Sequence, residues 1–219
     1  MKDIDWALVA ERFKALYVPA ICDVLDEYEL YFQFMHHDIK PLNRELKVAG
    51  PAFTIIGQSN RTRDQSKRVG PRVIDNFRPH VVAVYSTQGD EQTGVWGELW
   101  ASGAQRKGCV GAIVDGGIRD TAYIRRTNFP MFYKFTCPGD ALGRFNIVDF
   151  ECPVSVGGVQ VKPGDYILGD EDGVVVIPAE LTMEVLVKAE ELCEKENLIR
   201  EAIGSGKALA DLYKEFGKF

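Results

Sequence analysis

Apolar residues recur every three or four positions near the start of the chain, at Trp6, Val9, Phe13 and Leu16. This spacing places them on one face of an amphipathic helix. A second helix is predicted from Pro19 to about Tyr28. Both helices are expected to cover a sheet.

Two apolar, β-branched runs follow and predict buried strands. The first, VAGPAFTIIG, lies between Lys47 and Gly57, and the second, VVAVYS, runs from Val81 to Ser86. The pattern then changes to a helix from Gly94 to Lys107, and Gly108 is suited to the position just past its end.

Strand and helix patterns alternate in the next segment. The run CVGAIVD predicts a strand, and Gly116-Gly117 predicts a turn. A short helix from Thr121 to Arg126 and a strand from Met131 to Phe135 are expected next. This alternation is typical of an α/β sheet.

The last third of the chain divides into a β-rich block and a helical tail. Short strands separated by turn residues are predicted between Pro153 and Pro178. A charged helix follows from Ala179 to about Ile203, and Gly204-Ser205-Gly206 ends it before a short terminal helix. We therefore expect a core domain over residues 1–178 and a C-terminal helical extension over residues 179–219.

Composition adds few constraints. The 219 residues are 46% hydrophobic and 26% charged, which is ordinary globular usage, and the formal net charge is -6. The longest apolar runs are too short to cross a bilayer. Five cysteines are scattered with no CxxC pair, so we expect reduced thiols in a cytoplasmic protein, with Cys109 in the core rather than catalytic.

One segment is strongly basic. It contains Arg61, Arg63, Lys67, Arg68 and Arg72. These residues alternate with polar ones in no recognisable nucleic-acid motif, so the segment is interpreted as a solvated loop or helix face. Small anions are the expected partners, and neither nucleic acid nor a membrane is expected.

The stretch from Gly97 to Asp120 holds the residue types that chemistry needs. Glu98 lies in the first turn of the predicted helix, where backbone N–H groups form an anion site. Twenty residues separate Glu98 from Arg119, and they comprise one helix and one returning strand. In a parallel sheet that strand would return Arg119 and Asp120 to the edge where the helix begins. An ordinary surface ion pair between Arg119 and a neighbouring acid is the alternative that the spacing leaves open.

The sequence of this stretch, GELWASGAQRKGCVGAIVDGGIRD, resembles the signature of the family of 4-hydroxy-4-methyl-2-oxoglutarate/4-carboxy-4-hydroxy-2-oxoadipate aldolases. That family also includes the regulator of ribonuclease E activity A. The segments ICDVLDEYEL, KVAGPAFTI and VSVGGVQVKPGDYILGDEDGVVVIP are similar to the family's early helix, first strand and β block. The resemblance implies a β/β/α swivelling sandwich that assembles as a homotrimer or hexamer.

The resemblance also implies a divalent-metal site for a pyruvyl group. Asp120 would bind Mg²⁺, or Mn²⁺ or another divalent cation, directly, and Arg119 would hold the enolate oxygen. At the helix start opened by Gly97, the amides of Leu99 and Trp100 would bind the pyruvyl carboxylate. Glu98 would position metal-bound water. Trp100 departs from the aliphatic residues that the family favours and could reshape the pocket.

A C-terminal acidic residue completes the implied site. In the aldolase members such a residue reaches the metal waters of a neighbouring subunit, and Glu194 and Glu196 are the best matches here. Solvent-facing helix charges are the alternative for each of them.

The function implied is that of a metal-dependent carbon–carbon lyase. It would cleave a 4-hydroxy-2-oxo acid to pyruvate and would also decarboxylate oxaloacetate, because both reactions pass through the pyruvate enolate. Two alternatives stay open: a non-catalytic regulator of ribonuclease activity, and a lyase for another 2-oxo acid.

Overall fold

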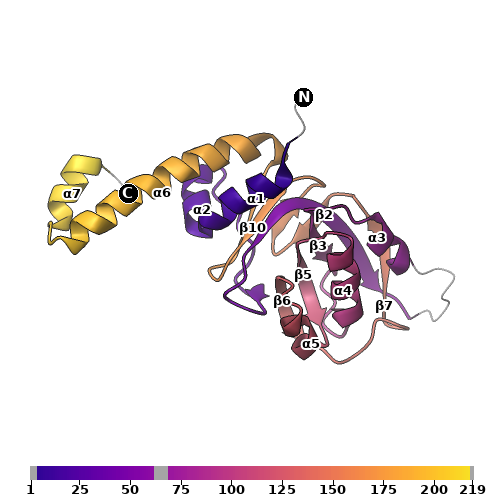
Figure 1. Cartoon of the computed structure of the whole chain (residues 1–219). Coiled ribbons are helices and arrows are strands. Elements are labelled where there is room, and N and C mark those ends of the chain that lie inside the picture. The colour runs from indigo at the N-terminus through magenta and orange to yellow at the C-terminus, as the bar shows by residue number, and fades with distance from the viewer. Residues whose placement is uncertain (1–3, 62–68, 218–219) are drawn as a thin grey trace.

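Runs of β-branched and aromatic residues form a curled sheet at the centre of the chain (Figure 1). The computed structural model describes residues 4–61 and 69–217. Within them, nine strands pair in the order β1-β6-β5-β3-β2-β10-β11, with β4 beside β5 and β7 beside β2; β8 and β9 form a separate hairpin. The strands are β1 Lys40–Pro41, β2 Val48–Ser59, β3 Val82–Ser86, β4 Gly94–Trp96, β5 Gly111–Ile118, β6 Met131–Thr136, β7 Phe145–Phe150, β8 Val154–Val156, β9 Val159–Val161, β10 Tyr166–Gly169 and β11 Val174–Ile177.

The parallel part of the sheet consists of β2, β3, β5 and β6, with β4 parallel to β5. Helices lie in the connections between these strands, and Figure 1 shows α4 and α5 on one side of the sheet. The helices are α1 Trp6–Ala15, α2 Val18–Asp26, α3 Gly70–Asn76, α4 Glu98–Arg106, α5 Thr121–Arg126, α6 Thr182–Gly204 and α7 Leu209–Phe216, with a 3₁₀ turn at Ala179–Leu181. Because the strands are parallel, their carboxyl ends meet at one edge of the sheet.

Three apolar clusters hold the layers together. One packs α3, α4 and α5 against the sheet around Phe53 and Trp96, which are fully buried. A second lies under the β8–β9 hairpin. The third joins α1, α2 and the start of α6 to β10 and β11, where Phe13 stacks on Tyr166 with ring centroids 4.5 Å apart.

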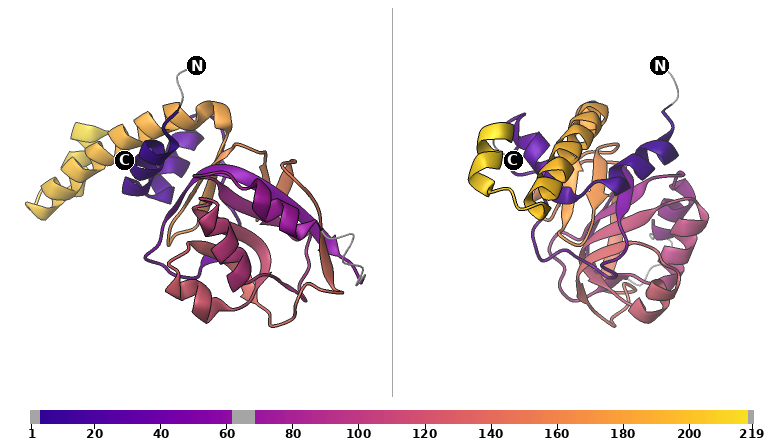
Figure 2. Two further views of the ribbon diagram at one scale, coloured as in Figure 1. Left: turned by 45° about the vertical axis from the view of Figure 1, so that its right-hand side comes forward. Right: turned by 60° about the vertical axis from the view of Figure 1, so that its left-hand side comes forward.

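The C-terminal helix α6 belongs to the core only at its beginning. Val185, Leu186 and Ala189 are buried, but beyond them only Ile199 is buried within α6. Figures 1 and 2 show the rest of α6 projecting from the body of the molecule, with α7 folded back beside its end.

The structure corrects two local predictions. Gly94–Trp96 is a strand rather than the start of a helix, because these residues pair with the end of β5, and α4 begins at Glu98. Gly116-Gly117 is not a turn but lies inside β5. A Cβ at Gly116 would lie 2.6 Å from Thr87 Cγ2, so glycine there permits close packing within the sheet.

Two predictions concern membranes and the basic segment. None of the helices among residues 4–61 and 69–217 has the length and apolar character needed to cross a membrane. Arg63, Lys67 and Arg68 lie outside the described residues. Arg61 follows Asn60, the residue after the end of β2, and Arg72 is an exposed residue of α3.

Candidate active site

The start of α4, at Gly97 and Glu98, is formed by a change from strand to helix. Trp96 is fully buried at the end of β4, and Gly97 keeps an extended backbone as the residue that caps α4. Gly97 itself has no side chain that could cap the first turn of α4. The amides of Leu99 and Trp100 in this turn are therefore suited to an external anion.

Arg119 and Asp120 return to this helix start, as the sequence predicted. The Arg119 amide donates a hydrogen bond to the Trp96 carbonyl over 2.9 Å, which fixes the end of β5 beside the end of β4. Asp120 has a left-handed backbone, with φ of 56°, and precedes α5. Its carboxylate accepts a hydrogen bond from the Glu98 amide over 3.3 Å. We call Gly97, Glu98, Leu99, Trp100, Arg119 and Asp120 the β4–α4 corner.

Gly97 is required by the close approach of these side chains. A Cβ at this position would lie 2.6 Å from Asp120 Oδ2 and 3.3 Å from both Cγ and Nε of Arg119. The first of these distances is shorter than a carbon and an oxygen tolerate without movement. The missing side chain therefore makes the space in which the carboxylate and the guanidinium lie against the helix start.

The Arg119 guanidinium lies between two carboxylates. Nε is 3.7 Å from Asp120 Oδ2, and Nη2 is 3.4 Å from Asp140 Oδ1. The Arg119 side chain is 36% exposed and that of Asp120 is 43% exposed. Pairs this exposed contribute at most about 1 kcal/mol to stability. The contacts thus position the guanidinium without occupying all five of its N–H donors.

Glu98 is held along its own helix. Its Oε1 accepts a hydrogen bond from Ser102 Oγ over 3.0 Å, one turn further on. The Leu99 side chain is 78% exposed, whereas Trp100 packs on the buried Trp96 with ring centroids 5.3 Å apart. The large Trp100 side chain is therefore accommodated by the core, and its amide stays in the first turn of α4.

The donor atoms at the corner fit a hard divalent cation held through few protein ligands. Asp120 offers carboxylate oxygens whose one described hydrogen bond is the long one from the Glu98 amide. Glu98 carries a second carboxylate in the first turn of α4. Mg²⁺ commonly binds proteins through one or two carboxylates and keeps several waters. Among residues 4–61 and 69–217, the grouping of three ligand-type side chains lies elsewhere, at the exposed His36, His37 and Asp38.

Glu194 and Glu196 are not brought to the corner of their own chain. They lie on the projecting part of α6 (Figure 1). Glu196 accepts hydrogen bonds from the Tyr17 hydroxyl and from Arg200 Nη2, the latter over 2.6 Å. Glu194 is exposed. Their role towards a neighbouring subunit stays a prediction.

Asp140 was not singled out from the sequence. It follows β6 in the segment Pro138-Gly139-Asp140 and forms a β-bridge with Gly94, whose amide donates to the Gly139 carbonyl over 2.8 Å. The contact of Asp140 with Arg119 depends on this long-range pairing, which the sequence pattern does not reveal. Cys109 is buried as predicted, and burial raises the pKa of its thiol to about 11, which leaves it unsuited to nucleophilic attack.

Comparison with known proteins finds several that are similar to this chain. A protein of Halalkalibacterium halodurans named putative 4-hydroxy-4-methyl-2-oxoglutarate aldolase is 31% identical over 204 residues, which are 93% of this chain and 92% of that protein. Protein DlpA of Legionella pneumophila is 34% identical over 180 residues, or 81% of this chain; the match spans only 29% of DlpA.

A solved structure shows the same fold. The Streptomyces coelicolor protein RraAS2, described as an unusual member of the RNase ES inhibitor RraA protein family, matches with a TM-score of 0.78 and 26% identity. The match covers 88% of this chain and 95% of RraAS2. The predicted fold class is confirmed. Since residues 18–176 also match the RraA-like family described as Aldolase/RraA, this chain belongs to that family.

Proposed function

We propose that this protein is a divalent-metal-dependent lyase that cleaves a 4-hydroxy-2-oxo acid to pyruvate. The observation that carries the proposal is the β4–α4 corner. There Arg119 and Asp120 lie against the start of α4, in the space that a side chain at position 97 would fill. Relatives named putative 4-hydroxy-4-methyl-2-oxoglutarate aldolase support the same reaction class.

The corner offers one group for each part of a pyruvyl unit. The amides of Leu99 and Trp100 bind the carboxylate at the positive end of α4. The Arg119 guanidinium faces the oxygen at C2, where negative charge develops. Asp120, with Glu98 acting through water, would hold Mg²⁺, which supplies Lewis-acid polarisation of the 2-oxo group.

In the proposed cleavage the bond between C3 and C4 breaks. The C4 hydroxyl proton is lost, C4 becomes a carbonyl carbon, and the electron pair of the broken bond passes to the pyruvyl fragment as an enolate. Arg119 stabilises that enolate until C3 takes a proton and pyruvate forms. Glu98, tethered by Ser102, orders the water that takes the hydroxyl proton.

Oxaloacetate is expected to react at the same corner. Loss of its C4 carboxylate as CO₂ leaves the same pyruvate enolate, so the groups that stabilise one leaving electron pair also stabilise the other. Decarboxylation needs no base for a hydroxyl proton. We therefore expect it to depend on Arg119 and Asp120 more strongly than on Glu98.

We further propose that the active protein is a homotrimer or hexamer, and that Glu194 or Glu196 serves the corner of a neighbouring copy. In this proposal residues 179–219 form an extension of the core domain 1–178. Supporting it, the far half of α6 and α7 expose large apolar side chains, among them Leu198 at 57% and Tyr213 at 53%. Light scattering of the purified chain tests the assembly, and a monomeric mass would contradict it.

A pyruvate-release assay tests the lyase proposal. Purified protein is incubated with 4-hydroxy-4-methyl-2-oxoglutarate or oxaloacetate and Mg²⁺, then with EDTA, and then with Mg²⁺ restored. We expect release that stops with EDTA and returns with the metal. The proposal fails if neither substrate gives metal-dependent pyruvate. In that case the RNase-inhibitor description of RraAS2 supports regulation of a ribonuclease instead, and capture of a ribonuclease at physiological salt is the corresponding test.

A further inference from the structure

The chain has three histidines, and two of them lie beside an aspartate away from the β4–α4 corner. His36, His37 and Asp38 each offer one ligand atom, and these three atoms lie within 4.8 Å of one another. His36 Nδ1 is 3.1 Å from Asp38 Oδ2, and His37 Nε2 is 3.4 Å from Asp38 Oδ1. We call these three residues the histidine turn.

The backbone of the histidine turn is fixed to the core on both sides. Met35, which precedes it, is buried, and its amide donates a hydrogen bond to the Val174 carbonyl over 2.8 Å. The His36 amide donates to the Gly157 carbonyl over 2.7 Å, and a Cβ at Gly157 would lie 2.6 Å from Met35 Cβ. Ile39, which follows the turn, is also buried. The ligand side chains therefore start from a fixed backbone, which reduces the entropy lost when they bind one ion.

The contacts within the histidine turn add little stability by themselves. The side chains of His36, His37 and Asp38 are 53%, 82% and 56% exposed, and ion pairs of such exposure are weak. The Asp38 amide donates to His36 Nδ1 over 3.4 Å, which is a long hydrogen bond that a metal ion would replace. Because these side chains are open to solvent, a hydrated ion reaches them without any opening of the fold.

The donor atoms favour a transition metal such as Zn²⁺ over Mg²⁺. Imidazole nitrogen suits Zn²⁺, Cu²⁺ and Ni²⁺, whereas Mg²⁺ takes oxygen ligands. Around a tetrahedral ion with bonds of about 2.0–2.1 Å, neighbouring ligand atoms lie about 3.3 Å apart. The separations of 3.1 and 3.4 Å in the histidine turn are close to that value. Two imidazoles and one carboxylate would leave one position of such an ion for water.

A cavity of about 430 Å³ lies beside the histidine turn, between the start of α2 and the residues that lead into β11. His36 and His37 line this cavity. Asp23 and Asp172 line it too, and both are exposed. Their negative charge attracts a cation to the place where the imidazoles lie.

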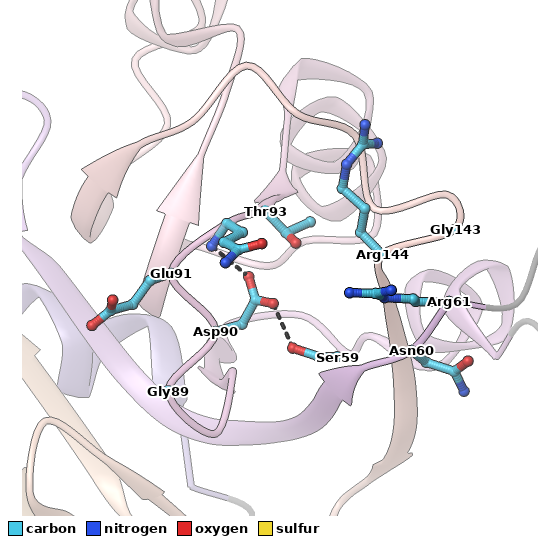
Figure 3. Close-up of a pocket in the computed structure, with 10 residues that line it drawn as sticks. Ser59, Asn60, Arg61, Gly89, Asp90, Glu91, Thr93, Gly143 and Arg144 are labelled. Carbon is cyan, nitrogen blue, oxygen red and sulfur yellow. Dashed lines mark hydrogen bonds between the residues drawn. The ribbon is translucent and has the colours of Figure 1, made fainter.

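The cavity drawn in Figure 3 is of a different kind and does not suit a cation. Its lining includes Arg61 and Arg144, whose charges repel one. Its Asp90 is already engaged, because Oδ2 accepts from Ser59 Oγ over 2.6 Å and Oδ1 accepts from the Gln92 amide over 3.1 Å. None of the described residues that line it is a histidine or a cysteine. The histidine turn is therefore the better site for a transition metal.

We propose that the histidine turn is a second metal site, which binds one Zn²⁺ through His36 Nδ1, His37 Nε2 and the Asp38 carboxylate. It is distinct from the Mg²⁺ site proposed at the β4–α4 corner, where the side-chain ligands offered are carboxylate oxygens. The two sites share no residue, so this inference does not depend on the lyase function.

Calorimetry with Zn²⁺, on chain that carries no affinity tag, tests the stoichiometry and the ligands. In Asp120→Asn, which removes the metal ligand proposed at the corner, we expect one Zn²⁺ per chain still to bind. His36→Gln and His37→Gln should each weaken binding at least about 10-fold, because loss of a group that merely orients a ligand already costs about 10- to 100-fold. His80→Asn is the matched control: it replaces the third histidine, tolerates the left-handed backbone there and should bind Zn²⁺ unchanged.

Nuclear magnetic resonance of ¹⁵N-labelled protein identifies the nitrogen atoms involved. We expect Zn²⁺ to shift Nδ1 of His36 and Nε2 of His37 and to leave the ring of His80 unchanged. Cys22→Ser removes a thiol that lines the same cavity, and it should alter neither the calorimetry nor these shifts. The assignment is overturned if the wild type binds no Zn²⁺, or if both histidine variants bind it as tightly as the wild type.

Discussion

The β4–α4 corner and the projecting half of α6 differ in what fixes their side chains. At the corner, a buried Trp96, a left-handed Asp120 and the missing side chain of Gly97 leave little freedom. On α6 beyond Ala189, Ile199 is the one buried residue, and the contacts of Glu196 with the other described residues are those with Tyr17 and Arg200. One chain therefore builds the pyruvyl half of the proposed site, whereas the extension has to meet another copy to contribute.

Filling the space at Gly97 should lower the activity of the corner more than any other change. In Gly97→Ala the new Cβ would lie 2.6 Å from Asp120 Oδ2, so Asp120 and Arg119 must both move. Misplacing groups by about 1 Å costs about 100-fold or more in rate, and we expect a loss of about 1,000-fold in pyruvate release.

Gly204, in the C-terminal extension, is the control for Gly97. A Cβ at Gly204, the last residue of α6, meets no atom within 4 Å. Gly204→Ala should keep full activity and hold or slightly raise the melting temperature, because alanine favours a helix. If Gly97→Ala were as active as Gly204→Ala, the tight fit at the corner would have no functional meaning.

Replacing Arg119 by lysine should have the next largest effect. A lysine keeps the charge, but it is a point charge and cannot face the enolate oxygen and Asp140 with one planar fork. We expect kcat to fall about 100-fold in Arg119→Lys while the folded content seen by circular dichroism stays unchanged. Wild-type turnover in this variant would remove Arg119 from the enolate role.

The two glutamates of the extension should show smaller and unequal effects. Glu194 is exposed and makes no hydrogen bond or ion pair with the other described residues, so Glu194→Gln should lower activity about 10-fold only if it reaches a neighbouring copy. Glu196→Gln also loses contacts with Tyr17 and Arg200 and should lower the melting temperature as well. Full activity in both single variants and in the double variant would contradict the shared site.

A difference in thiol reactivity between the corner and α6 is the smallest effect that we expect. Burial raises the pKa of Cys109, beside the corner helix, to about 11, and burial also raises the pKa of Cys193 on α6, which is only partly covered. Iodoacetamide at about pH 8 should therefore modify Cys193 before Cys109, because the thiolate is the reactive form. Peptide mass spectrometry gives the order, and faster labelling of Cys109 would show that the corner opens.

The same pKa shift has a consequence for stability at high pH. The Cys109 thiol titrates near pH 8.5 when unfolded and near 11 when folded, so the unfolded chain loses its proton first. Its contribution is fully present below about pH 8.5 and is lost as the pH rises towards 11. Cys109→Ala should flatten the stability curve in that window, as measured by denaturant titration.

The fold was predictable where the pattern was local or continuous. The apolar runs of β2 and β3 and the helix Thr121–Arg126 needed only periodicity and turn residues. β7 was missed because its six residues are only partly buried and become a strand by pairing with β2. Gly116-Gly117 was predicted as a turn because glycine is common in turns. In the structure, Gly116 instead allows β5 to pack closely on Thr87, which only the three-dimensional arrangement reveals.

The candidate site was predictable to a similar degree. Parallel topology alone implies that Arg119 and Asp120 return to the start of α4, and the structure brings them there. The left-handed backbone of Asp120 and the contact of Arg119 with Asp140 could not be predicted. These features depend on how loops far apart in the sequence pack against one another.

Exchange of the pyruvate methyl protons with deuterium tests the central claim most directly, because forming the enolate from pyruvate needs only the pyruvyl half of the site. Proton NMR in D₂O follows the methyl signal with Mg²⁺, after EDTA, and with Asp120→Asn, which tolerates the left-handed backbone at this position. We predict exchange by the wild type that requires Mg²⁺ and is absent in Asp120→Asn. Wild-type exchange no faster than buffer with Mg²⁺, or equal exchange in Asp120→Asn, would contradict the claim that this corner stabilises a pyruvate enolate.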